Sequence, residues 1–215
     1  MGSKKNPWLS KQKSDPYYKR SKNEHHRARS YYKLQEIDRK YHILSVNGRF
    51  PKKILDLGAA PGAWIEYTSN QYQSLPEKQQ SKKFQIVGID LTSIRPFSEL
   101  PNIKCFRMDI FKPECEAFIQ ESSPWDVILS DLAPKTAGDF RDVAIQESMV
   151  QKVLYFTRYL KIGGNIVVKI FQSDQSNVIF EKWKPAFRLF KRMKPSASRP
   201  KSRELYFIGK SYIGL

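Results

Sequence analysis

The sequence has few cysteines and no long apolar run, and both shortages narrow the class of protein. Cys105 and Cys115 are its only cysteines, which are too few for a disulfide framework and lack the spacing of a metal site. We therefore predict a reducing compartment, the cytoplasm, and no metal. No apolar run approaches the roughly 18 residues that cross a bilayer, and the polar start of the chain argues against a secretory signal peptide. A membrane partner is not expected.

Acidic residues are missing from one long stretch of the chain. Residues 182–203 hold nine basic side chains and no acidic one, and residues 1–53 hold 15 basic against 4 acidic side chains. The 215 residues together carry a net charge of +17, so the remainder of the chain is close to neutral. Basic charge gathered in two segments predicts a polyanionic partner such as nucleic acid. The alternative is a basic surface that only keeps the protein soluble.

The pattern of apolar residues predicts one folded domain. We expect a flexible basic arm over residues 1–20 and a single domain over residues 21–215. Strands are expected at 53–57, 85–90, 103–109, 125–131, 165–171, 188–193 and 204–209, and helices at 27–42, 62–72 and 142–160, the last ended by Gly163 and Gly164. This alternation predicts an α/β fold, with a doubly wound, mostly parallel seven-stranded sheet and helices on both faces.

Such sheets bind ligands in the crevice beyond the carboxyl ends of their strands. The first strand runs into LDLGAAPGAW, residues 55–64, whose small residues let a ligand approach the backbone closely. This loop matches neither the dinucleotide pattern GxGxxG nor a P-loop. Asp90 and Asp109, at the ends of the second and third strands, suit a ribose and an adenine amino group. The set predicts an adenosine cofactor without phosphates, and S-adenosylmethionine fits better than NAD. Each aspartate alone is better explained as a helix cap or turn former, but the features at successive strand ends together favour the cofactor.

Several segments, taken in order, make the chain similar to a known family. They are RARSYYKL (27–34), LDLGAAPGAW, SDLAP (130–134), VVKIF (167–171) and SRELYFIG (202–209). Together they resemble the FtsJ/RrmJ family of RNA ribose 2′-O-methyltransferases, from about residue 15 to residue 210. Ala63 departs from the pattern, since many members have glycine there. The resemblance implies a Rossmann-like methyltransferase domain with S-adenosylmethionine held by Asp56, Gly58, Ala60, Pro61, Gly62, Trp64, Asp90, Leu91, Asp109, Ile110 and Asp131. Core packing is the alternative role for Trp64.

The same resemblance implies a catalytic tetrad around the transferred methyl group. The family's Lys-Asp-Lys-Glu set matches Lys33, Asp131, Lys169 and Glu204. The residues alone make this credible for Lys169, because a lysine inside an apolar strand is costly unless it is paired. We expect Lys169 to accept the 2′-hydroxyl proton beside the cation of Lys33, with Asp131 orienting Lys169 and Glu204 holding one lysine. Without the resemblance, Lys33 would pass for a solvated lysine on an amphipathic helix.

The sequence therefore predicts an S-adenosylmethionine-dependent RNA ribose 2′-O-methyltransferase, acting as a monomer on a uridine of large-subunit ribosomal RNA. Phosphate contacts are expected from Arg27, Arg29, Arg199 and Lys201, on one RNA-binding face. A transfer RNA anticodon loop is an alternative substrate that the core motifs do not separate from ribosomal RNA. A non-catalytic RNA-binding module and a small-molecule methyltransferase are further alternatives. The intact tetrad argues against the first and the two basic segments argue against the second.

Overall fold

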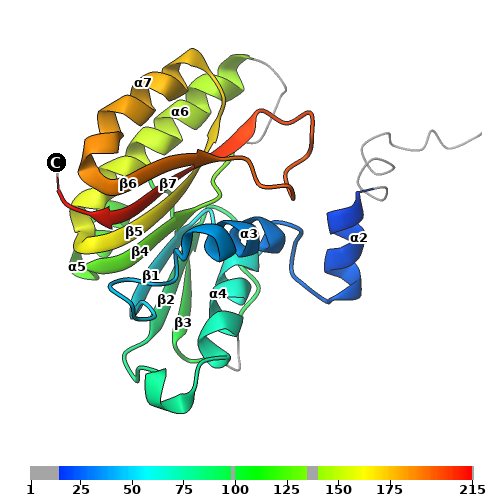
Figure 1. Ribbon diagram of the computed structural model, residues 1–215, viewed down its shortest axis with the longest axis vertical. Helices are drawn as coiled ribbons and strands as arrows, with labels where there is room; N and C mark the ends of the chain where they lie inside the picture. The colour runs from blue at the N-terminus through cyan, green and yellow to red at the C-terminus, as the bar shows by residue number, and fades with distance from the viewer. Residues whose placement is uncertain (1–14, 98–99, 135–139, 215) are drawn as a thin grey trace, which may run out of the picture.

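A seven-stranded sheet forms the centre of the computed structural model, which describes residues 15–97, 100–134 and 140–214 (Figure 1). The strands lie in the order β3-β2-β1-β4-β5-β7-β6. Their bounds are Lys53–Leu57 (β1), Gln85–Asp90 (β2), Ile103–Arg107 (β3), Trp125–Ser130 (β4), Leu160–Phe171 (β5), Phe187–Met193 (β6) and Glu204–Tyr212 (β7). Strands β1 to β5 pair in parallel, and β7 runs antiparallel to both of its neighbours, β5 and β6. The predicted mostly parallel sheet is confirmed.

Helices cover both faces of this sheet, as the alternation of segments predicted. Figure 1 shows α3 (Tyr31–Tyr41) and α4 (Ala63–Gln73) on one face, and α6 (Phe140–Tyr155) and α7 (Asp174–Trp183) on the other. Helix α5 (Pro113–Glu121) packs on the same face as α6 and α7. Short 3₁₀ helices occupy Glu77–Gln79, Phe156–Tyr159 and Lys184–Ala186. Each face of the sheet buries its own apolar cluster, which is the source of the fold's stability.

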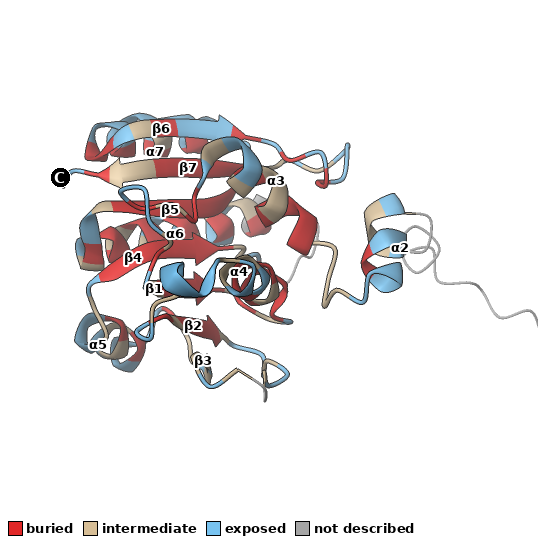
Figure 2. Cartoon of the chain, turned by 60° about the horizontal axis from the view of Figure 1, so that its bottom comes forward, coloured by how far each residue is buried: buried red, intermediate tan, exposed pale blue. Residues whose placement is uncertain are grey.

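The central strands are buried on both faces, which explains their continuous apolar sequences. Every residue of β4 is buried, and Figure 2 shows the buried strands enclosed by half-exposed helices. Two charged side chains interrupt this apolar interior close to the carboxyl ends of the strands. Asp56 is 1% exposed and Lys169 is 6% exposed. Charges are buried this deeply only where a partner or a ligand stabilises them, so these two residues point to the functional site.

The predicted arm over residues 1–20 differs from the structure in its last part. Residues 1–14 lie outside the described residues, whereas Pro16–Asn23 form helix α2 (Figures 1 and 2), which contacts α3 through the rings of Tyr17 and Tyr32, whose centres lie 5.6 Å apart. The Asp15 side chain accepts hydrogen bonds from the N–H groups of Tyr17 and Tyr18. An N-cap aspartate followed by proline at the first helical position is a strong helix start.

The two adjacent glycines do not end a helix, contrary to the sequence expectation. Helix α6 ends at Tyr155, and Gly163 and Gly164 lie inside β5. The pairing of β4 with β5 shifts register close by, and Gly163 adopts a φ of 84°. A Cβ on Gly164 would lie 2.8 Å from the backbone oxygen of Asp126. The glycines are therefore explained by a strand irregularity and a close backbone approach.

Candidate active site

Charged side chains from α3, β5, β7 and the end of β4 meet at the carboxyl ends of the central strands. Asp131 directly follows β4, and Lys169 lies in β5. Because β7 is antiparallel to β5, Lys169 lies opposite Tyr206. Glu204 comes two residues before Tyr206 in β7 and lies on the same face of the strand. Lys33 approaches from helix α3. The structure thus brings together all four residues of the predicted tetrad.

The four residues are arranged as two ion pairs. Lys169 Nζ lies 3.1 Å from Asp131 Oδ1 and donates a hydrogen bond to the Asp131 backbone oxygen at 2.6 Å. Lys33 Nζ lies 2.7 Å from Glu204 Oε1, which also accepts from Ser198 Oγ at 2.6 Å. Both lysines are buried, Lys33 at 8% exposure. Each buried ammonium group therefore has a carboxylate beside it, which is the condition for holding a charge in the interior.

Tyr206 connects the two ion pairs, and the sequence analysis did not select it. Its hydroxyl donates to Asp131 Oδ1 at 2.6 Å, and its ring centre lies 5.8 Å from Lys33 Nζ. Burial, followed by the negative charges of Asp131 and Glu204, raises the pKa of Tyr206 well above its usual value. The hydroxyl therefore keeps its proton and acts as a donor. Its place two residues after Glu204 in a strand was the signal available in the sequence.

Asp131 is held in its ionised form by its neighbours. Burial alone would raise its pKa, but the ammonium groups of Lys169 and Lys33, together with the Tyr206 hydroxyl, outweigh burial and lower the pKa of Asp131 below its ordinary value. The backbone beneath the pair is fixed as well. Gln146 of α6 donates to the carbonyl oxygen of Lys169 at 2.9 Å. A fixed negative charge can therefore orient the Lys169 amine.

Two glycines shape the loop that follows β1. Gly58 and Gly62 have φ values of 77° and 103°, which L side chains rarely adopt. A Cβ on Gly58 would lie 2.8 Å from the Leu132 side chain, and one on Gly62 would lie 2.9 Å from the Phe97 ring. The loop is therefore packed closely from both sides, and it keeps its backbone next to the crevice.

Asp90 and Asp109 both stabilise turns at the rim of the crevice. Asp90 Oδ2 accepts from the Ala60 N–H at 3.0 Å, and Asp90 Oδ1 accepts from the Thr92 N–H at 2.7 Å. Asp109 Oδ1 accepts from the Phe111 N–H at 3.0 Å. The turn-forming role that the sequence left open is thus present. A carboxylate oxygen has a second lone pair, so these contacts leave acceptors for a ligand.

The remaining predicted cofactor residues differ in exposure. Leu91 is 57% exposed, Pro61 is also exposed, and Ile110 is buried. Trp64 is 2% exposed, its indole N–H donates to the Ser30 carbonyl oxygen at 2.9 Å, and its ring centre lies 5.8 Å from that of Tyr206. Trp64 therefore packs behind the cluster of Lys33, Asp131, Lys169 and Glu204, as the core-packing alternative expected.

Asp56 carries a buried carboxylate that no described residue neutralises. Neither carboxylate oxygen has a hydrogen-bond partner among the described residues. Burial, followed by the negative charges of Asp131 and Asp90, raises the pKa of Asp56 well above its usual value. Three carboxylates therefore gather at the ends of β1, β2 and β4. This arrangement suits a positively charged ligand, which would stabilise the ionised form of Asp56 that burial disfavours.

Arg27, predicted to contact RNA phosphates, is half-buried and makes several contacts with its own chain. Its guanidinium group donates to the carbonyl oxygens of Pro61, Arg95 and Pro96 at 3.1, 2.6 and 2.9 Å. It also stacks 3.6 Å over the centre of the Phe97 ring. Arg27 thus joins the loop after β1 to the loop after β2. These contacts assign it a structural role next to the predicted cofactor residues.

The other three predicted RNA contacts lie around the loop between β6 and β7, residues 194–203. Arg29 pairs with Asp15 and donates to the Ala197 carbonyl oxygen, so it too is engaged internally. Arg199 and Lys201 are exposed. Figure 1 shows this loop beside α3. The Glu36 side chain of α3 accepts a hydrogen bond from the Ser196 N–H of the loop at 2.8 Å. The two basic segments of the sequence therefore meet on one side of the molecule.

Neither a metal cluster nor a membrane-spanning helix is present among the described residues. No group of three or more His, Cys, Asp or Glu side chains in 15–97, 100–134 and 140–214 could hold a metal ion. Over the same residues, no helix has the length and apolar character needed to cross a membrane.

Comparisons with known proteins agree with this geometry. Residues 26–212 match the model of the family described as FtsJ-like methyltransferase. Relatives named ribosomal RNA large subunit methyltransferase E include those of Syntrophobacter fumaroxidans, 36% identical over 91% of this chain and 94% of the relative, and Archaeoglobus fulgidus, 35% identical over 94% and 98%. A crystal structure assigned to a ribosomal RNA methyltransferase of Plasmodium falciparum superimposes with a TM-score of 0.70 at 28% identity, covering 88% of this chain and all of that one.

Proposed function

The chain belongs to the FtsJ-like methyltransferase family, and on this premise we propose that it transfers a methyl group from S-adenosylmethionine to a ribose 2′-hydroxyl of large-subunit ribosomal RNA. The observation that carries the proposal is the pairing of Lys169 with Asp131 and of Lys33 with Glu204 in one crevice. The names of the relatives favour ribosomal RNA over transfer RNA. A uridine target, a monomeric state and a cytoplasmic location stay predictions.

The residues of the crevice fit S-adenosylmethionine. When bound, this cofactor supplies a methyl group on a positively charged sulfur. The buried, unpartnered carboxylate of Asp56 suits a cationic ligand, and Asp90 offers acceptors for ribose hydroxyls beside the close-packed loop at Gly58 and Gly62. We assign the remaining predicted cofactor residues to the same pocket, namely Ala60, Pro61, Trp64, Leu91, Asp109, Ile110 and Asp131.

Proton removal from the attacking hydroxyl is assigned to Lys169. A ribose hydroxyl is a poor nucleophile until its proton leaves, and the Lys169 amine can accept that proton once its own ammonium group has released one to solvent. Asp131 fixes the direction of the Lys169 amine, and the adjacent backbone carbonyl oxygen adds a second anchor. Lys33 keeps a second positive charge near the cluster because Glu204 holds it in place. Alignment of the hydroxyl with the methyl group contributes to the rate as well.

RNA binding is assigned to the side where the basic loop 194–203 meets α3. Arg199 and Lys201 are exposed there, and among the described residues their one ion pair is the long contact of 3.8 Å between Arg199 Nε and Asp15 Oδ2, whereas hydrogen bonds to backbone carbonyl oxygens engage Arg27 and Arg29. Lysine and arginine on such a surface neutralise phosphates without reading sequence. The catalytic Glu204 directly follows this loop, so RNA bound to the loop would lie at the mouth of the crevice.

The test is a map of 2′-O-methyl groups in total RNA from cells with and without this protein. We expect one or a few sites in large-subunit ribosomal RNA to lose their methyl group when the protein is absent. A cell line that carries Lys169→Ala, expressed at the normal level, should match the line without the protein. Loss of a methyl group only from transfer RNA, or only from a base, would contradict the proposal.

A further inference from the structure

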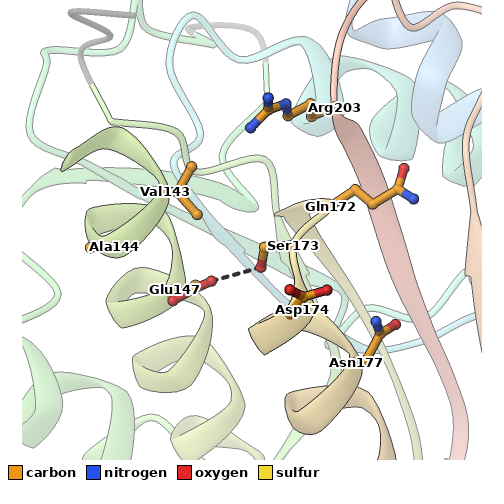
Figure 3. Close-up of a pocket in the computed structure, with 8 residues that line it drawn as sticks. All are labelled: Val143, Ala144, Glu147, Gln172, Ser173, Asp174, Asn177 and Arg203. Carbon is orange, nitrogen blue, oxygen red and sulfur yellow. Dashed lines mark hydrogen bonds between the residues drawn. The ribbon is translucent and has the colours of Figure 1, made fainter. Parts of the chain in front are cut away.

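A hollow of about 620 Å³ lies beside the cluster of Lys33, Asp131, Lys169 and Glu204, between α6, α7 and the start of β7 (Figure 3). It is lined by Val143, Ala144, Glu147, Gln172, Ser173, Asp174, Asn177 and Arg203. Figure 3 shows the α6 residues on one wall, the residues that open α7 on the other, and Arg203 at the rim. We propose that this hollow binds the nucleotide next to the methylated one, and that it favours a base with an exocyclic amino group. The inference rests on the proposed function.

Backbone hydrogen bonds join the hollow directly to β5 and β7, the strands that carry Lys169 and Glu204. The Gln172 N–H donates to the Arg203 carbonyl oxygen at 2.8 Å, which extends the β5–β7 ladder one step beyond Glu204. On the other wall, the Gln146 side chain donates a hydrogen bond to the carbonyl oxygen of Lys169. Glu147, the next residue of α6, lines the hollow. A ribose placed at Lys169 would therefore have its neighbouring nucleotide at this opening.

The chemistry of the lining decides what the hollow accepts. Glu147 is fixed by a hydrogen bond from Ser173 Oγ at 2.7 Å, and Asp174 lies across from it in the first turn of α7. Two carboxylates disfavour a phosphate in the interior, but they accept well from the N–H groups of amino-bearing bases. The amide oxygen of Asn177 can accept from the same exocyclic amino group, so Asn177 contributes to the preference for amino-bearing bases. Guanine, cytosine and adenine carry an exocyclic amino group, and uracil does not.

Arg203 supplies the charge that a phosphate requires. Its side chain is exposed at the rim of the hollow, and a guanidinium group binds two phosphate oxygens at once. An RNA strand would thus place one phosphate at Arg203 and turn the adjoining base between α6 and α7. Proteins recognise RNA sequence mostly through such unpaired, splayed bases. The hollow therefore combines a phosphate contact with base discrimination.

The test measures the binding of short single-stranded RNAs to the full chain. The probes are nine-nucleotide RNAs with a central uridine and each of the four bases at one of the two flanking positions, and fluorescence anisotropy gives their Kd values. At one flanking position, uracil should weaken binding by about tenfold relative to the best amino-bearing base. Asn177→Leu should reduce that discrimination to less than about twofold, and Arg203→Ala should weaken all four probes alike.

Matched controls are available on other elements. Asn70 is an exposed helical asparagine of α4, and Arg188 is an exposed arginine of β6. Asn70→Leu and Arg188→Ala should leave the base discrimination unchanged. Discrimination that survives in Asn177→Leu, or that is absent from the parent at both flanking positions, would overturn the proposal.

The same experiment separates this inference from the proposed function. If Asn177→Leu keeps the base discrimination while the parent methylates ribose in large-subunit RNA, the function stands and the hollow is overturned. If the parent discriminates through Asn177 but transfers no methyl group to any RNA ribose, the base-binding hollow stands and the proposed function is overturned.

Discussion

The Tyr206 hydroxyl donates a hydrogen bond of 2.6 Å to the same oxygen of Asp131 that lies 3.1 Å from Lys169 Nζ. One carboxylate oxygen therefore has both a neutral donor and a cation beside it. This shared contact fixes Asp131 from two strands, β5 and β7, and it leaves the direction of the Lys169 amine little freedom. Buried networks of this kind behave as a unit, so changes at Tyr206 and Lys169 should not be additive.

Replacing Lys169 should remove methyl transfer while leaving the fold and cofactor binding intact. Lys169→Ala deletes the group assigned to accept the 2′-hydroxyl proton, and positioned bases contribute about 10²–10⁴-fold to rates. Lys169→Arg should be nearly as slow, because arginine keeps its proton near neutrality. Single-turnover transfer to large-subunit RNA measures the rate, and calorimetry measures cofactor affinity. A rate within about threefold of the parent would remove Lys169 from the base role.

Asp56→Asn should increase the stability of the cofactor-free protein and weaken its binding of the cofactor. The folded protein raises the pKa of Asp56 well above the ordinary value of 3.8, so the unfolded chain ionises first as pH rises. The wild-type fold therefore loses stability as pH rises above about 3.8 towards the folded pKa, and asparagine removes that loss. We expect a gain of about 1–3 kcal/mol at pH 7.

Thermal unfolding at pH 3 and pH 7 checks this expectation, because the gain should appear at pH 7 and shrink in acid. Calorimetry should show weaker S-adenosylmethionine binding by the variant at pH 7. A variant that is less stable than the parent at pH 7, with unchanged cofactor affinity, would mean that Asp56 serves the fold and not the cofactor.

Replacing Arg27 should weaken cofactor binding more than RNA binding. Its guanidinium group holds three carbonyl oxygens of the two loops around the predicted pocket and stacks on Phe97. Arg27→Ala should weaken cofactor binding by roughly tenfold, about 1.4 kcal/mol. Arg27→Lys keeps the charge but cannot span these acceptors, so it should not restore affinity. Full recovery of cofactor affinity in Arg27→Lys would instead mean that the positive charge at this position, and not the three carbonyl contacts, supports the pocket.

Neutralising the exposed cations of the loop should weaken RNA binding and flatten its dependence on salt. The double variant Arg199→Ala with Lys201→Ala should lower the slope of log Kd against log salt by roughly 0.7 for each single-strand phosphate that the protein no longer neutralises. Lys82 and Lys83 are exposed just before β2, at the opposite end of the strands, so the same change there is the matched control. Equal slopes in both double variants would place the RNA-binding face elsewhere.

The sequence predicted the sheet well and its helices less completely. Strands such as 53–57 and 125–131 were recognisable because burial on both faces makes them continuous apolar runs. Helix α7 escaped prediction since its capping box pairs Ser173 with Ser176, whereas the usual signal has Glu or Gln at the third helical position. Helix α5 is nine residues long, which is too short for a clear amphipathic period.

At the site, the sequence predicted which side chains meet but not all of their partners. Lys169 and Asp131 could be paired because both lie near the ends of neighbouring strands. The contacts of Arg27 could not be foreseen, because its acceptors are backbone carbonyl oxygens, which every residue carries. For the same reason the sequence does not separate a basic residue that contacts its own chain from one that is available to RNA. The number of basic residues predicts a nucleic-acid partner. Only the structure shows which of these side chains already contact groups of the protein itself.

The ion pair between Lys33 and Glu204 joins helix α3, near the start of the described chain, to the final strand of the sheet. A protein is synthesised from its N-terminus, so Lys33, Asp131 and Lys169 leave the translating ribosome well before Glu204 and Tyr206. Contacts between such distant parts of a chain form late and slowly. A partly synthesised chain would therefore hold an incomplete catalytic cluster, and we expect transferase activity to begin only once β7 has inserted between β5 and β6.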